Sequence, residues 1–314
     1  MRLNERATLD QDLGDSIDWS PSASLNHKWA PEILSHLFHL DGYKNLSPQI
    51  RLRYNQFFSM LVIEQIASFE RDVLAKVDTQ VFKRLKERNS VEQHLKIALE
   101  HFVREEKNHV DFFEKLVAKS KTALGLESGF RSFQVSGLQG RFVSFLFSSP
   151  RFFIFWIWVV LFVEERTLLI ARLMRKDSDS YDPLHFQVQQ AHLRDETRHV
   201  QLDEHLLEVC WDQAPALLKK LNVFLLKVFF EMTFVRSMSA VRLWKLFSRH
   251  VPEAATHTNE VVNELRTLSK NTTYLLQFFS QDSAPRFWKM LNSRAEMAPL
   301  SRYLRGKIES LPYP

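Results

Sequence analysis

The sequence predicts an all-α protein whose core is a four-helix bundle with one long crossover and additional C-terminal helices. Strand signals are weak throughout the 314 residues. Proline is absent between Pro48 and Pro150, which leaves room for two long helices in that stretch. The predicted helices are joined by short connections and one long segment, and this pattern indicates the topology.

Proline preceded by a side-chain acceptor marks three helix starts. Ser47-Pro48, Ser149-Pro150 and Asp182-Pro183 each place an acceptor at the N-cap and proline at the first helical position. The segment 90–93, with the sequence SVEQ, reads as a capping box. We therefore expect the four bundle helices at about 48–87, 90–120, 150–177 and 183–211.

The lengths of the connections indicate how these helices are arranged. The first pair is joined by a few residues and the second pair by the short segment MRKDSDSYD, so we expect each pair to be antiparallel. A long crossover, 121–149, joins the two pairs, which is the connection pattern of a ferritin-like bundle. It holds four of the seven glycines of the chain: Gly125, Gly129, Gly137 and Gly140.

The rest of the chain is expected to cover this bundle. Short helical pieces are predicted near 31–40, a long or kinked helix over 215–249, another near 254–270, and shorter ones beyond. Composition shows no break that would separate a second domain. We expect one domain over 1–314, made of a polar N-terminal arm (1–47), the bundle core (about 48–211) and covering helices (215–314).

Composition excludes several classes of function. The formal net charge is +5 and the basic residues are scattered, so nothing demands a nucleic-acid partner. The single Cys210 excludes a disulfide framework and a multi-cysteine metal site. Gly-x-Gly-x-x-Gly and Walker-type loops are absent from the sequence, which makes a phosphate-binding cradle unexpected.

No membrane span is expected. The longest apolar run, FFIFWIWVVLFV at 152–163, has 12 residues, whereas a membrane helix needs about 18 or more. We interpret this run as a fully buried core helix. The N-terminal segment lacks the apolar stretch of a secretory signal, so we expect a cytoplasmic protein.

Two copies of one pattern carry the chemistry of the chain. The sequences REEKNH and RDETRH, which end at His109 and His199, both read R-[D/E]-E-x-x-H. Residues three apart share a helix face, so Glu106 and Glu196 can each present a carboxylate beside the following imidazole to one metal ion. Two such helices facing each other form the core of a dimetal carboxylate site.

A second internal repeat supplies further carboxylates. The segment ERDVL, which begins at Glu70, resembles ERTLL, which begins at Glu165, and each lies one helix before a Glu-x-x-His pair. A dimetal bundle needs one more carboxylate from each of these helices. Glu64 competes with Glu70, and Glu164 with Glu165, because each pair points to different faces of its helix. The Glu-Arg repeat favours Glu70 and Glu165.

Glu105 and Asp195 each directly precede the glutamate of a Glu-x-x-His pair. Such a residue either belongs to a polar helix face or accepts a hydrogen bond from a ligating imidazole and fixes its orientation. The sequence leaves both interpretations open.

His192 breaks the symmetry of the two copies. It lies on the same helix face as Glu196 and His199, whereas the corresponding residue of the earlier helix is Phe102. We predict that His192 is a third imidazole ligand of the metal site.

The pattern H-x-x-x-E-x-x-H, from His192 to His199, resembles the p-aminobenzoate N-oxygenase (AurF-like) family of ferritin-like di-iron oxygenases. That family adds a third histidine to the usual four carboxylates and two histidines. The resemblance covers roughly residues 50–211. Carried over residue by residue, it implies the metal ligands Glu70, Glu106, His109, Glu165, His192, Glu196 and His199.

The resemblance also implies an activity. Carboxylate and imidazole ligands suit two iron ions, or manganese, and O2 is the implied co-substrate. The enzyme is expected to oxidise an amine nitrogen of a small aryl amine or amino-acid-derived substrate, free or bound to a carrier protein, in natural product biosynthesis. The product is a hydroxylamine, or a nitroso or nitro compound after further oxidation. An electron donor is an implied partner, and the resemblance suggests a homodimer.

Two other functions stay open. One is a di-iron oxidase that acts at carbon, such as a hydroxylase or desaturase, and His192 argues against it. The other is a non-catalytic, ferritin-like protein that handles iron. The long segment after residue 211 and the lack of an evident acidic lining argue against that alternative.

Overall fold

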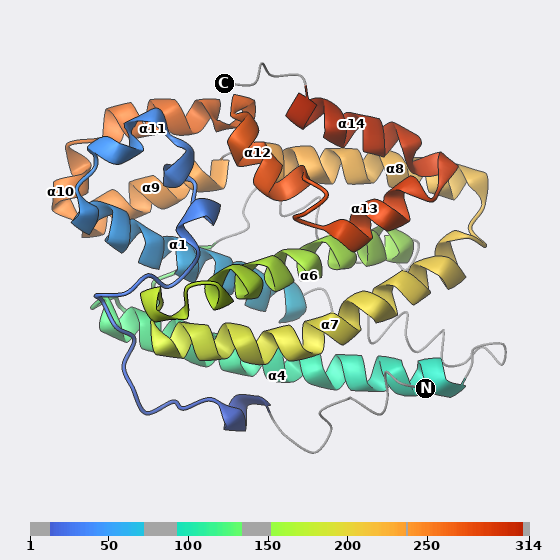
Figure 1. Ribbon diagram of the computed structural model, residues 1–314, viewed down its shortest axis with the longest axis horizontal. Coiled ribbons are helices and arrows are strands. Elements are labelled where there is room, and N and C mark those ends of the chain that lie inside the picture. The colour runs from blue at the N-terminus through green and yellow to red at the C-terminus, as the bar shows by residue number, and fades with distance from the viewer. Residues whose placement is uncertain (1–12, 72–92, 134–151, 237, 310–314) are drawn as a thin grey trace.

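The computed structural model describes residues 13–71, 93–133, 152–236 and 238–309. Its architecture is the all-α, ferritin-like bundle that the sequence predicts. The bundle helices lie along the long axis of the molecule, with α4 packed against α7 and α7 against α6 (Figure 1). They are α1 (Pro48–Phe69), α4 (Gln93–Ala123), α6 (Phe153–Arg175) and α7 (Pro183–Trp211).

Local sequence signals fix the helix ends as predicted where the structure describes them. The side chain of Ser47 accepts from the N–H of Ile50, and that of Asp182 accepts from the N–H of His185. The helix expected at 183–211 agrees with α7. Residues 72–92 and 134–151, which include the predicted capping box and Ser149-Pro150, lie outside the described residues.

Gly125 ends α4 and starts the crossover. Its N–H bonds to the carbonyl of Thr122 (3.1 Å), and the N–H of Leu126 bonds to the carbonyl of Lys121 (2.9 Å), which is a Schellman motif. Gly125 has φ of +65°, a left-handed conformation that glycine adopts without strain. The glycine cluster therefore begins with a helix stop, while Gly137 and Gly140 lie outside the described residues.

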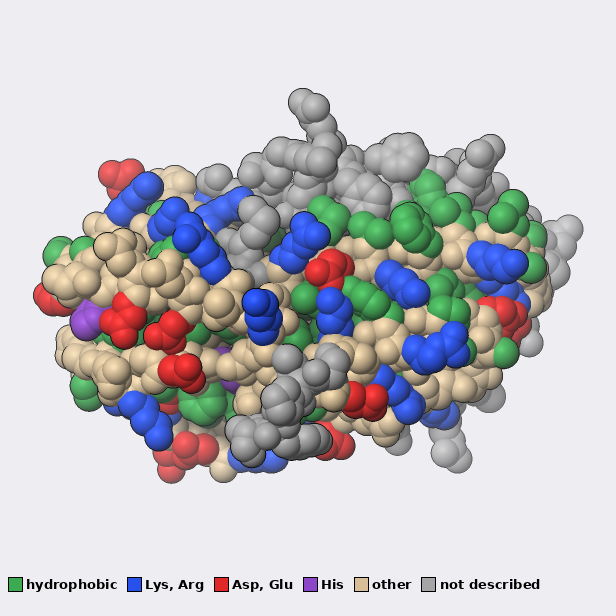
Figure 2. Space-filling model, turned by 90° about the horizontal axis from the view of Figure 1, so that it is seen from above, with side chains coloured by type: hydrophobic (Ala, Val, Ile, Leu, Met, Phe, Trp, Pro, Cys, Tyr) green, Lys and Arg blue, Asp and Glu red, His purple; other side chains and the backbone are tan. Residues whose placement is uncertain are grey.

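A second layer of helices covers the bundle above α6 (Figure 1). A π-helix, η10 (Glu231–Val235), separates two of them, so the helix predicted over 215–249 is kinked. Figure 2 shows Lys and Arg beside Asp and Glu on the outer face of this layer, in line with the scattered charge of the sequence. Its helices are α8 (Ala216–Phe230), α9 (Met238–His250), α10 (Pro252–Ala255), α11 (Thr258–Thr267), α12 (Thr272–Phe279), α13 (Pro285–Asn292) and α14 (Ala298–Glu309).

The apolar run of the sequence forms the first half of α6, at the centre of the core. Trp158, Leu161 and Phe162 have no exposed surface because α7 packs on one side of α6 and α8 and α13 pack on others. The prediction of a buried core helix is confirmed. Within the described ranges, no helix is long and apolar enough to cross a membrane.

The N-terminal arm is tied to the bundle more closely than its polar composition indicates. Asn55 of α1 accepts from the N–H of Trp29 (2.8 Å) and donates to the carbonyl of Ala30 (2.8 Å). Trp29 is buried and stacks on His185 of α7, with ring centroids 4.4 Å apart. The helical pieces expected near 31–40 are 3₁₀-helices, Glu32–Leu34 and Leu37–His39.

His36 of this arm is buried between helices. Its Nδ1 lies 3.3 Å from the hydroxyl of Tyr54, and its ring packs edge-on against Phe58 at 5.3 Å. Burial, and then the nearby His39, lower the pKa of His36 from 6.5 to about 3. Below about pH 6.5 this histidine binds a proton in the unfolded chain. In the folded protein His36 stays neutral until the pH approaches about 3.

We predict that acid destabilises the protein through His36. Because the lowered pKa belongs to the folded state, stability is present above pH 6.5 and is lost as pH falls toward 3. This group should remove about 2 kcal/mol of the free energy of unfolding between pH 7 and pH 5. Urea denaturation at both pH values should show a smaller loss for His36→Gln than for the wild type. Equal losses would show that His36 is not responsible.

Candidate metal centre

The structure brings six of the seven predicted ligands together in the middle of the bundle. They form two overlapping groups, and within each group one ligand atom of every residue lies within 4.8 Å of the others. All six side chains are buried. One group comprises Glu70, His109, His192 and Glu196, and the other comprises Glu106, His109, Glu196 and His199.

Glu196 of α7 lies between the imidazoles of the cluster. Its Oε1 is 2.9 Å from Nε2 of His192 and 3.3 Å from Nδ1 of His199, both on the same helix. The same oxygen is 3.5 Å from Nδ1 of His109 on α4. This carboxylate therefore belongs to both groups.

Glu106 of α4 faces Glu196 across the cluster. Its Oε1 lies 2.9 Å from Nδ1 of His199, and its Oε2 lies 3.7 Å from Nδ1 of His109. The two glutamates of the Glu-x-x-His pairs thus each lie between imidazoles of α4 and α7. In that position each carboxylate could bind a metal ion together with imidazoles of both helices.

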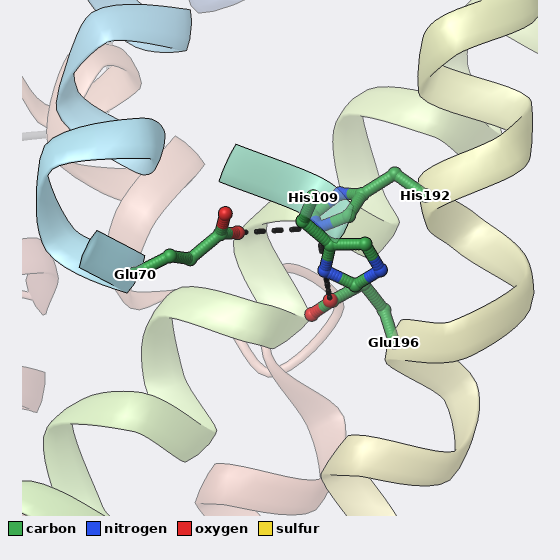
Figure 3. A group of neighbouring side chains, drawn as sticks. All are labelled: Glu70, His109, His192 and Glu196. Atoms are coloured by element: carbon green, nitrogen blue, oxygen red, sulfur yellow. Dashed lines mark ion pairs between the residues drawn. The ribbon is translucent and has the colours of Figure 1, made fainter. Parts of the chain in front are cut away.

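Glu70 closes the first group from α1. It follows the last residue of α1 and still has helical backbone angles, φ −60° and ψ −48°. Figure 3 shows its carboxylate extending from the end of α1 toward His192, whose Nε2 lies 3.4 Å from Oε1. The structure therefore places Glu70 beside the imidazoles, and its role as a metal ligand stays a prediction.

Six atoms of the cluster, one from each residue, form no hydrogen bond of suitable geometry with any described residue, although several of them lie close together. Buried polar atoms are normally paired, so a set of buried nitrogens and oxygens like this one fits the donor set of a cation site. The residues fit two metal ions, and nitrogen and oxygen donors without sulfur suit iron or manganese. The unpaired atoms are Oε2 of Glu70, Oε2 of Glu106, Nδ1 of His109, Nε2 of His192, Oε1 of Glu196 and Nδ1 of His199.

Glu105 and Asp195 hold the outer nitrogens of two imidazoles. Nε2 of His199 lies 2.9 Å from Oε2 of Glu105, and Nε2 of His109 lies 3.1 Å from Oδ2 of Asp195. Each acidic residue therefore orients the histidine of the opposite helix, and the second of the two interpretations of the sequence is the one observed. Arg198 donates to both carboxylates and joins the two networks.

Glu165 is the predicted ligand that the structure does not bring to the cluster. Its two oxygens accept hydrogen bonds from the backbone N–H groups of Arg286 (3.0 Å) and Phe287 (2.7 Å), in the first turn of α13. A carboxylate is stabilised there because the first N–H groups of a helix lack partners within the helix. Glu164 faces the cluster instead, with Oε1 4.0 Å from Nδ1 of His199.

Glu64, the other competing carboxylate, lies away from the cluster. Its Oε2 accepts from the N–H and hydroxyl of Ser132 (2.7 Å each) and from the N–H of Phe133 (2.9 Å). Its Oε1 lies 3.4 Å from Nζ of Lys121. Glu64 therefore ties the start of the crossover to α1.

Asp203 is a residue of this region that the sequence reasoning missed. It is buried on α7, one turn after His199, and within hydrogen-bonding reach of Glu164. The signal was present in the sequence, because positions 192, 196, 199 and 203 share one helix face. Asp203 lies outside the Glu-x-x-His pattern, so that pattern does not identify it as a candidate site residue.

The electrostatics of the cluster depend on burial and on the dense packing of carboxylates. Burial, and then the charge of Glu106, raise the pKa of Glu70, and burial also raises the pKa of Glu164. Burial alone would lower the pKa of His109, but Asp195 and Glu106 raise it to about 9. The cluster therefore holds protons at neutral pH that a bound metal ion displaces.

The bundle is that of a ferritin-like protein, and the carboxylates and histidines of its buried cluster fit a site for two metal ions. Residues 5–279 match the family model described as p-aminobenzoate N-oxygenase AurF. The chain therefore belongs to the AurF family, and the match extends on both sides of the bundle. Membership marks the protein as an oxygenase, and together with the cluster it points to a di-iron site. No curated protein sequence matches the chain.

We predict that Glu105→Gln weakens metal binding although Glu105 does not face the cluster centre. Loss of the carboxylate leaves Nε2 of His199 without its charged acceptor, and such changes typically lower metal affinity by about 10- to 100-fold. Calorimetric titration of the metal-free protein with Mn²⁺ measures the effect. Glu114→Gln, which changes an exposed carboxylate of α4, is the control and should bind like the wild type. An unchanged affinity in Glu105→Gln would contradict the prediction.

Proposed function

We propose that the protein is a di-iron oxygenase that uses O2 to oxidise an amine nitrogen of a small molecule. The observation that supports this best is the third imidazole. His192 lies 2.9 Å from Glu196 and 3.4 Å from Glu70 within the buried cluster, and it is the residue on which the resemblance to N-oxygenases rests. Family membership supports the same activity.

The proposed ligand set contains three histidines and four glutamates. Glu106 and Glu196 would be shared by the two positions, because each lies between imidazoles of both helices. Glu164 takes the place of Glu165, whose carboxylate is engaged by the first turn of α13. The first position is completed by Glu70, His109 and His192, and the second by Glu164 and His199.

Iron bound to these residues supplies the binding and two-electron reduction of O2. In the first oxidation, one oxygen atom enters an N–H bond of the amine to give a hydroxylamine, and the other leaves as water. The step consumes two electrons and two protons, so an electron donor is required. Further oxidation gives a nitroso or nitro compound.

The chain itself holds the ligands rigidly and keeps water away from them. Phe102 packs against the ring of His199 at 4.5 Å, and Phe113 packs against the ring of His192 at 4.9 Å. These apolar side chains limit hydrolysis and side reactions of an oxidising centre. We also propose that the substrate is an aryl amine or an amino-acid-derived amine, free or bound to a carrier protein, and that the protein forms a homodimer.

The proposal is tested by turnover with labelled oxygen. The full chain, loaded anaerobically with Fe²⁺, is mixed with ¹⁸O2, a chemical reductant and a panel of aryl amines and amino acids. Mass spectrometry should detect a hydroxylamine that carries one ¹⁸O atom, and Glu196→Ala should form none because it lacks a bridging carboxylate. Oxygen insertion at carbon would replace the proposal with a hydroxylase. Iron oxidation without any organic product would favour an iron-handling protein.

A separate prediction tests whether Glu164 or Glu165 is the metal ligand. Glu164→Gln should lose tight binding of one of two Mn²⁺ ions, because it removes a charged ligand at the second position. Glu165→Gln should keep both ions and lower the thermal midpoint of unfolding, because it weakens the link to α13. Mn²⁺ titration and thermal denaturation of both variants separate the two roles. The reverse pattern would return the ligand role to Glu165.

A further inference from the structure

The helices α4 and α7 present equivalent residues at positions that differ by 90 in sequence. Ring packing repeats in the same way. The ring of His192 lies 4.5 Å from that of His109, and the ring of Phe102 lies 4.5 Å from that of His199. Four positions follow this relation: Phe102 with His192, Glu105 with Asp195, Glu106 with Glu196, and His109 with His199.

One further position on the same helix faces departs from this symmetry. Phe113, one turn after His109, corresponds to Asp203, one turn after His199. Phe113 is an apolar wall beside His192. Asp203 replaces that wall with a carboxylate at the other end of the cluster. At two positions, therefore, α4 has a phenylalanine where α7 has a side chain that can bind a metal ion. His192 corresponds to Phe102 and lies at the first metal position, and Asp203 corresponds to Phe113 and lies on the side of the second.

The surroundings of Asp203 favour the binding of a cation. It is 3% exposed, and no donor among the described residues bonds to its Oδ2 or to either oxygen of its neighbour Glu164. The charges of His199 and Glu196 also act on Asp203. Among the described residues, no lysine or arginine forms an ion pair with Glu164 or Asp203. Two buried carboxylates that face each other with no lysine or arginine paired to them are destabilising unless a proton or a cation is bound between them.

We propose that Asp203 is a further metal-binding residue, which supplies a carboxylate oxygen to the second metal position beside Glu164 and His199. The inference rests on the proposed di-iron function. It makes the two positions chemically different. The first has two imidazoles, His109 and His192, whereas the second has one imidazole and two carboxylates of its own.

The charge of the whole region agrees with this role. Seven buried carboxylates and one guanidinium leave a formal charge of −6 when all are ionised, which exceeds the +4 of two divalent ions. The region can therefore compensate metal ions of higher charge, and Asp203 places the extra charge at the second position. The seven are Glu70, Glu105, Glu106, Glu164, Asp195, Glu196 and Asp203, and the guanidinium is that of Arg198.

Metal titration of the full chain tests the inference without turnover. The metal-free wild type is titrated with Mn²⁺ by calorimetry and should bind two ions. Asp203→Asn, which keeps the shape of the side chain, should weaken one of the two by at least about tenfold and leave the other unchanged. Asp203→Glu, which keeps the carboxylate, should retain more of the affinity than Asp203→Asn. Glu165→Gln is the matched control, since it removes a buried carboxylate next to Glu164 that does not face the cluster.

The visible spectrum of bound Co²⁺ provides a second readout, because its intensity depends on the number and geometry of ligands. Asp203→Asn should change the spectrum of one of the two ions, and Glu165→Gln should change neither. If Asp203→Asn binds two Mn²⁺ ions with wild-type affinity and its Co²⁺ spectrum is unchanged, the inference about Asp203 is overturned while the dimetal site is not. A wild type that binds fewer than two ions would overturn the dimetal site and the inference with it. Equal weakening of both ions, with a lower thermal midpoint, would show a structural role and also overturn it.

Discussion

The burial of like charges is the constraint on which this structure depends. Four helices direct carboxylates into the middle of the bundle, and within the described part of the chain three imidazoles and Arg198 lie among them. In an interior of low dielectric this arrangement is stable only with protons or cations bound to it. The site is therefore held in a state that favours metal binding, and the surrounding core must be rigid enough to keep the carboxylates together.

Rigidity comes from the reciprocal arrangement of α4 and α7. Each helix supplies a glutamate, a histidine and an acidic residue that orients the histidine of the other helix. Arg198 connects the two acidic residues, so displacement of either helix disturbs both imidazoles. The covering helices contribute as well, because the first turn of α13 holds Glu165 and thereby fixes the rotation of α6. The second layer therefore positions the site as well as covering it.

Much of this site could be predicted from short-range patterns. Helix starts follow from Ser47 and Asp182, and the i, i+3 spacing places Glu106 with His109 on one face whatever the rest of the fold does. The choice between Glu164 and Glu165 could not be predicted this way. Adjacent residues point about 100° apart on a helix, and the rotation of α6 is set by contacts with residues more than a hundred positions later in the chain.

The sequence by itself determined the helical class, the bundle topology and the residue types of the candidate metal site, since these follow from periodicity, caps and spacing along single helices. That residues 1–314 form one domain stays a prediction. Only the tertiary structure decided which carboxylate of α6 faces inward, which acid orients which histidine, and that Asp203 joins Glu164. Those outcomes depend on how helices distant in sequence are rotated against one another, and that rotation is fixed by packing in three dimensions.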